Sequence, residues 1–203
     1  MIRKTSITGV FIAVLVAMTP VVSHAQLSVA DPGVKELEFS GDFVFLSEAP
    51  VETIEGTVPG AKGHVTTNTE DLSQTSGTIS VPVEGMKTGN KTRDKHVVGK
   101  HRLEAKKYPE ITFEILSVNV VSIDDSAEVK VAELEATGQF SLHGQTKEMT
   151  IPLTLKWKGD KVKVSAEFEV ALADYAVAGK KGVVGERVGT SIKLTANLTG
   201  SVQ

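Results

Sequence analysis

The sequence predicts an all-β protein built as one antiparallel meander, on the strength of three observations. Apolar and polar residues alternate with a period of two through most of the chain, which is typical of strands with one buried and one exposed face. Long stretches with the 3.6-residue period of an amphipathic helix are missing. Short turn-forming segments separate the alternating stretches, namely EAP, VPG, DD, HGQT and KGDK.

The alternation is clearest between residues 148 and 157. One face of this stretch is apolar and the other is mostly polar. The apolar face consists of Met149, Ile151, Leu153, Leu155 and Trp157. Pro152 lies inside this stretch and cannot donate a backbone hydrogen bond, so we expect its strand to be an edge strand or to be bulged there.

The same pattern, taken along the whole chain, predicts eight or nine strands. Two stretches do not follow it: residues 87–107, and the Gly-rich loop 174–189. No internal repeat, linker or second domain is evident. The expected strands are residues 35–46, 51–58, 63–67, 75–84, 111–123, 128–143, 148–157, 161–172 and 190–202.

An all-β chain of this size is expected to form a sandwich or a barrel. Alternation alone does not distinguish these two folds. It also does not show whether the apolar faces pack into a filled core, which is the commoner arrangement, or line a cavity.

The N-terminal 25 residues have the features of a signal peptide. Arg3 and Lys4 form a basic region, residues 10–18 are apolar, and the small residues of SHA at 23–25 suit a signal peptidase. The apolar run is short for a membrane span, although a retained N-terminal anchor is the alternative. We therefore expect a periplasmic or secreted protein, with residues 26–203 forming a single domain.

Charge and cysteine content exclude several classes of protein. Residues 26–203 carry 20 basic and 25 acidic side chains, which does not favour a general nucleic-acid binder. The chain has no cysteine, which excludes disulfides, thiolate metal sites, covalent c-type haem and a lipidated N-terminal cysteine. A domain of roughly 180 residues can bury a core large enough to hold it together without disulfides.

The segment 87–107 concentrates charge of one sign. It holds eight lysines and arginines against Asp94 and Glu104. A solvated loop is the default interpretation. A metal site at Asp94, His96 and His101 is disfavoured because the surrounding cations would oppose a divalent ion. Catalysis is disfavoured because the chain has no G-x-S-x-G motif, and because its acidic residues mostly alternate outward.

Two further interpretations of this segment fit the residues better. Gly89, Asn90 and the neighbouring cations suit an anion cradle for a phosphate or pyrophosphate. Alternatively, Asn90, Arg93, Asp94 and His96 simply fix a connection across the end of the sheet.

Three motifs in this order resemble the YceI-like family of exported bacterial proteins. The first is TGNKTRDKH, which supplies Asn90, Arg93, Asp94 and His96; the second is KKYPEITF; the third is GQFSLHGQTK, with His143. The resemblance is strongest over residues 81–157, and the C-terminal part is compatible with it. The N-terminal third departs from the family pattern, because the usual I-D-x-x-H-S-x-v-x-F strand is absent.

The resemblance implies a lipocalin-like antiparallel barrel of eight strands, with a short helical segment near residues 90–107. Some family members carry a polyisoprenoid chain in the lumen. The implied function is a non-catalytic carrier or store of a polyisoprenoid or quinone-like lipid, with no cofactor and no metal. An eight-stranded barrel is just wide enough for side chains or one slim ligand. The alternative is an exported protein-interaction module with a filled barrel core.

The resemblance and the alternation together predict the site residues. Residues of the TGN and HGQ motifs, Asn90, Arg93, Asp94, His96 and His143, are expected to contact a head group or to be structural. Expected partners are an isoprenoid lipid and, transiently, a membrane surface; a homodimer is a further alternative, and nucleic acid is not expected. The predicted lumen residues are Phe39, Phe43, Phe45, Ile79, Val81, Phe113, Ile115, Phe140, Leu142 and Phe168.

Overall fold

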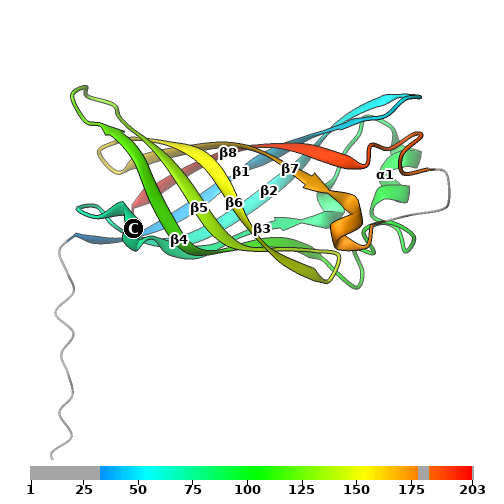
Figure 1. Cartoon of the computed structure of the whole chain (residues 1–203), viewed down its shortest axis with the longest axis horizontal. Helices are drawn as coiled ribbons and strands as arrows, with labels where there is room; N and C mark the ends of the chain where they lie inside the picture. Colours follow the sequence, from blue (N-terminus) through cyan, green and yellow to red (C-terminus); the bar gives the residue numbers. More distant parts are fainter. Residues whose placement is uncertain (1–32, 178–182, 203) are drawn as a thin grey trace, which may run out of the picture. The chain divides into compact units, whose positions relative to one another are not determined.

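The computed structural model describes residues 33–177 and 183–202. These residues form a closed barrel of eight antiparallel strands, in which each strand pairs with the next and β8 returns to β1 (Figure 1). The predicted fold class is confirmed, and it is a barrel rather than a sandwich. The strands are β1 (Val34–Glu48), β2 (Thr53–Asn68), β3 (Ser76–Pro82), β4 (Glu110–Asp124), β5 (Lys130–Leu142), β6 (Gln145–Lys158), β7 (Lys161–Ala171) and β8 (Ser191–Val202).

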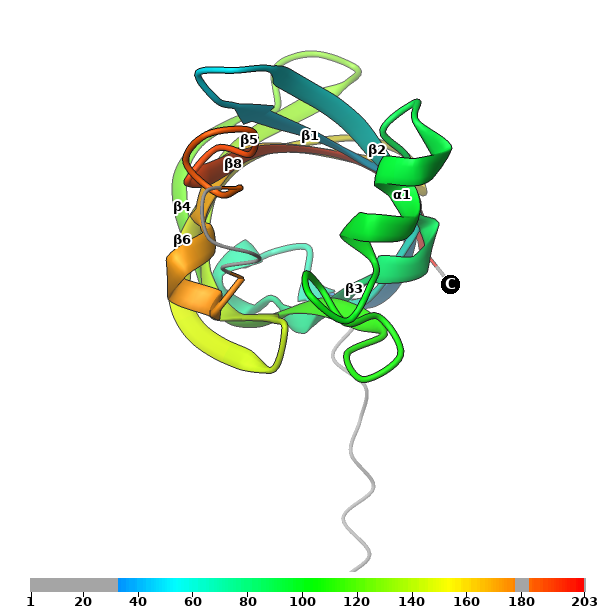
Figure 2. The same cartoon turned by 90° about the vertical axis from the view of Figure 1, so that its right-hand side faces the viewer.

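Short helices lie at the two ends of the barrel. The 83–109 segment between β3 and β4, which we call the connector, contains η2 (Val83–Gly85) and α1 (Lys91–Val97). It lies at one end, the α1 end, together with η3 (Leu172–Tyr175) (Figure 2). The opposite end, the η1 end, carries η1 (Leu72–Gln74) and the β4–β5 and β6–β7 turns. The predicted helical segment is therefore confirmed, although α1 covers only part of it.

The nine expected strand segments become eight strands because two of them belong to β2. The expected turn at VPG is wrong. Gly60 is an extra residue opposite the Gly41/Asp42 step of β1, where the register shifts, and its φ of +84° suits glycine. The Gly60 N–H also donates to Asp42 Oδ1 at 3.3 Å. A β-bulge thus absorbs the Pro-Gly pair without ending the strand.

Two pairs of adjacent strands, β2–β3 and β6–β7, separate toward the α1 end. β2 pairs with β3 only between Lys62 and Thr66, and β6 pairs with β7 only from Leu153 onward. Pro152 keeps a regular register with Glu135 of β5, so the expected bulge is wrong there. It is the first β6 residue beyond the β7 ladder, as suits a residue that cannot donate a backbone hydrogen bond.

Candidate functional site

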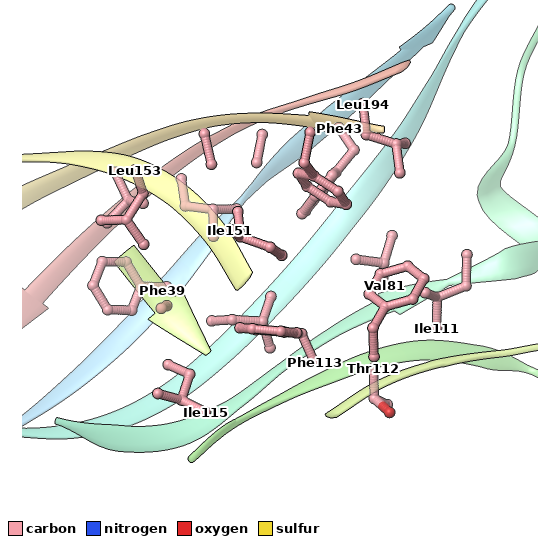
Figure 3. A pocket seen from close by; sticks show the side chains of 18 of the residues that line it. Phe39, Phe43, Val81, Ile111, Thr112, Phe113, Ile115, Ile151, Leu153 and Leu194 are labelled. Atoms are coloured by element: carbon pink, nitrogen blue, oxygen red, sulfur yellow. The ribbon is translucent and has the colours of Figure 1, made fainter. Parts of the chain in front are cut away.

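The inward faces of the strands enclose an apolar cavity of about 240 Å³ that extends from η1 to the connector. Phe39 and Phe43 of β1 face Phe113 and Ile115 of β4 and Ile151 of β6 across it (Figure 3). Threonines are the only polar residues, and no side chain is charged, among the described residues that line it. An apolar cavity of this size stays dry or takes an apolar ligand, because water needs polar partners.

All ten predicted lumen residues line this cavity. They do so because a strand's alternate side chains point to one face, and closure of the barrel turns that face inward. Their role in ligand binding stays a prediction. Small residues make the space between the large ones: Ala136, Ala166 and Ala196 also line the cavity and are buried.

Both ends of the cavity are lined by side chains that the alternation did not identify. Leu72 of η1 lines it at one end, and Met86, Val97 and Leu103 of the connector line it at the other. Leu103 is buried within a second apolar cluster at the α1 end, together with Val83 and Tyr175. For the connector residues, the only sign of burial in the sequence was the presence of apolar residues in or beside a charged segment.

Residues of the TGN motif make hydrogen bonds within the connector. Asn90 caps α1, because its Oδ1 accepts from the backbone N–H groups of Thr92 and Arg93 at 3.0 and 3.1 Å. The N–H and hydroxyl of buried Thr88 both donate to Asp94 Oδ1, at 2.7 and 2.6 Å. These contacts support the structural interpretation of Asn90 and Asp94.

Arg93 ties the connector to the β1–β2 turn. Its Nε donates to Thr88 Oγ1 at 3.0 Å, and its Nη2 donates to the Thr88 carbonyl oxygen at 3.2 Å. Its Nη1 donates to Glu52 Oε2 at 2.8 Å, which forms an ion pair. The guanidinium is thus engaged by the protein, and it does not line the cavity.

The two histidines of the motifs occupy different environments. His96 is exposed on α1. His143 lies in the β5–β6 turn, where its Nδ1–H donates to the Tyr175 carbonyl oxygen at 3.1 Å. Its buried Nε2 has no hydrogen-bond partner among the described residues and lies 3.6 Å from Glu104 Oε1. His143 therefore bridges η3 and the connector, the two segments that cover the α1 end.

The structure does not bring Asp94, His96 and His101, the residues of the alternative metal site, together as metal ligands. Within residues 33–177 and 183–202, no group of three or more His, Asp or Glu side chains could hold a metal ion. Asp94 is turned toward Thr88, while His96 is exposed. The 178–182 part of the Gly-rich loop, with Gly179 and Gly182, lies outside the described residues, as does the expected signal peptide.

Asp94 gives the connector a pH-dependent stability. Hydrogen bonds from the Thr88 hydroxyl and then the Thr88 backbone hold the pKa of Asp94 below its ordinary value of 3.8. Because the folded-state pKa is depressed, this contribution is present above pH 3.8 and is lost as the pH falls through the lower folded-state value.

We therefore expect Asp94→Asn to lower the melting temperature at pH 7 by a few degrees. The difference from the wild type should shrink when the pH falls below 3.8. Thermal unfolding followed by circular dichroism measures both. Asp125→Asn is the matched control, because Asp125 is exposed in the β4–β5 turn and has no hydrogen bond to another described residue. A deficit that persists unchanged at low pH would contradict this account of Asp94.

These features define a lipocalin-like barrel with an apolar lumen, closed at one end by a motif-bearing connector. The family model of the YceI-like domain matches residues 26–199, and the chain belongs to this family. A UPF0312 protein of Pseudomonas putida strain W619 is 25% identical over 189 residues, covering 88% of this chain and 90% of that protein. Protein YceI of Salmonella arizonae is 26% identical over 139 residues, covering 66% and 68%.

Solved structures share the fold at low sequence identity. Burkholderia cenocepacia BcnA superposes with a TM-score of 0.66 at 18% identity, covering 78% of this chain and 94% of that one. A polyisoprenoid-binding domain from Saccharophagus degradans, implicated in plant cell wall breakdown, superposes with a TM-score of 0.63 at 13% identity, covering 84% and 99%. At such identities the likeness establishes the barrel.

No helix among the described residues has the length and apolar character needed to cross a membrane.

Proposed function

We propose that this protein is an exported, non-catalytic carrier that holds one isoprenoid lipid or isoprenoid quinone in its barrel lumen. The observation that carries the proposal is the apolar cavity, which runs from η1 to the connector. No charged side chain lines it among the described residues. A sugar or an amino acid would find few polar partners there. A branched hydrocarbon chain needs none, and membership of the YceI-like family supports the same cargo.

Energetics favour a carrier over a permanent trap. Each CH₂ group moved from water into the lumen contributes roughly 0.8 kcal/mol before the costs of binding. A prenyl lipid normally resides in a bilayer, however, which is already apolar, so its transfer from bilayer to barrel contributes little net free energy. The protein is therefore suited to exchange its cargo with a membrane.

The absence of catalysis is part of the proposal. General acid–base chemistry needs a titratable side chain within hydrogen-bond reach of the substrate. The described lining of the cavity offers hydrocarbon, the Met86 thioether and threonine hydroxyl groups only. Export rests on the signal-peptide features of residues 1–25, and a homodimer stays a prediction.

A displacement assay tests the proposal. Protein stripped of lipid is loaded with a fluorescent polyene, whose emission rises in a dry apolar site. We expect polyprenyl alcohols and prenylated quinones to displace the probe, while soluble sugars and amino acids should not. A protein that takes up no probe, or that releases it to no prenyl compound, would contradict the carrier function. It would favour the alternative of an interaction module with a filled core.

A further inference from the structure

The connector has two chemically different faces. Its inner face closes the lumen through Met86, Val97 and Leu103. Its outer face presents six exposed lysines, and none of them forms an ion pair with another described residue. These lysines, which we call the connector lysines, are Lys87, Lys91, Lys95, Lys100, Lys106 and Lys107.

Charge on the connector contrasts with the rest of the domain. Residues 87–107 hold eight basic and two acidic side chains, a net charge of +6. The remaining residues from 26 onward hold 12 basic and 23 acidic side chains, a net charge of −11. Positive charge is therefore concentrated in the segment that carries α1. Such a charge distribution orients a molecule toward an anionic surface.

Internal contacts do not account for the connector lysines. The connector is fixed by Arg93, Asn90 and Asp94, whose partners lie within the protein. Among the six lysines, Lys107 lies over the Tyr108 ring at 4.8 Å, and Lys87 joins β2 through its backbone and helps to lower the pKa of Asp94. The ammonium groups of the others have no described partner. Six like charges on one short segment repel each other, so an external anion would reduce this electrostatic repulsion.

The strand pairing is also incomplete at the α1 end, as the β3–β4 ladder is toward the η1 end. At the α1 end the β2–β3 and β6–β7 ladders stop short, and the outer part of β2 is joined to the connector by the Thr57–Lys87 backbone pair, with both bonds at 2.8 Å. Fewer ladder hydrogen bonds hold the wall at this end. The cationic surface thus lies at the end of the lumen that the connector covers.

We propose that the connector lysines dock the α1 end on an anionic lipid surface. This inference rests on the proposed carrier function for its purpose, because it places the closed end of the lumen against the bilayer that supplies the apolar chain. A juxtamembrane lysine cluster gains free energy from anionic head groups, and the gain falls with salt. Nucleic acid is a poorer match, because the rest of the domain is strongly acidic.

Vesicle flotation tests the docking surface. The protein is mixed at low salt with vesicles of phosphatidylcholine alone, or of equal parts phosphatidylcholine and phosphatidylglycerol. We expect the wild type to float only with the second kind, and added salt to abolish flotation. The variant K91Q/K95Q/K100Q/K106Q should partition onto those vesicles about 100-fold more weakly or worse.

The chain offers a matched control at the opposite end. Lys156 faces Lys163 and Lys158 faces Lys161 across the β6–β7 hairpin, so K156Q/K158Q/K161Q/K163Q removes the same charge from the η1 end. This control should float like the wild type. Equal loss in both variants would show an effect of net charge alone, and loss in the control only would place the dock at the η1 end; either result overturns the proposal.

Cargo is measured separately, by native mass spectrometry of the connector variant. We expect the bound lipid to remain while flotation is lost. If flotation follows the connector lysines but neither wild type nor variant holds lipid, the docking surface stands and the carrier function fails. If lipid is bound and flotation is unaffected by K91Q/K95Q/K100Q/K106Q, the carrier function stands and the docking surface is wrong.

Discussion

The double variant Ala136→Leu and Ala166→Leu is expected to empty the barrel of lipid without weakening the fold. Both alanines are buried and line the cavity, on β5 and β7. Leucine side chains there would occupy space that we assign to the cargo. Filling a cavity commonly raises the free energy of unfolding by about 0.5–2 kcal/mol, so lipid binding and stability should change in opposite directions.

The same variant separates the carrier from a barrel with a filled core. Extra methylene groups in a closely packed core usually cost about 1–3 kcal/mol at each site. A marked loss of stability, measured by denaturant unfolding on lipid-free protein, would therefore favour the filled core. Retained stability together with lost displacement of the polyene probe would support the carrier. Leu153→Met, which nearly conserves volume in the lumen, is the control and should change neither quantity much.

The second large effect is expected for Arg93→Ala. The substitution removes hydrogen bonds to the Oγ1 and carbonyl oxygen of Thr88, a buried residue, together with the ion pair to Glu52. The half-exposed ion pair contributes little, and the bonds to Thr88 contribute most of the effect. We expect a loss of about 2 kcal/mol, which for a domain of this size lowers the melting temperature by roughly 4–8 °C.

Arg93→Ala should also loosen the cover of the lumen, because the connector carries Val97 and Leu103 over its end. Release of the polyene probe to empty vesicles should be faster than for the wild type. Arg102→Ala is the matched control, since Arg102 lies in the same segment and its hydrogen bond reaches only the neighbouring His101 carbonyl oxygen. An Arg93 variant that melts and releases probe like the Arg102 variant would contradict the structural role.

Alternation was enough to predict the strands and their apolar faces, while the barrel was implied by the family resemblance. Within that barrel, Phe39 and Phe113 could be placed in the lumen from the parity of their strands, and the structure puts both there. Turn-forming residues misplaced a turn at residues 58–60, since a bulge lets proline and glycine sit inside a strand when an opposing strand shifts its register.

The connector shows what local patterns do not contain. Asn90 can be recognised from sequence as a helix cap, but the partner of Arg93 is Glu52, 41 residues away, and no local period relates the two. Leu103 and Val97 close the lumen from a segment dominated by charge, so their burial depends on how the connector folds back over the barrel. The proposed docking role of the lysines rests on their exposure and on the lack of ion pairs with other described residues, which only the structure supplies.

The carrier function is tested most directly by native mass spectrometry of the full chain, expressed in the cells that make it and purified without detergent. Bound material is then released into organic solvent and identified. The account predicts one prenyl lipid or prenylated quinone per barrel, lost in the Ala136→Leu, Ala166→Leu variant. Detection of the bare polypeptide mass, with no uptake from an extract of the host's lipids, would contradict the carrier function.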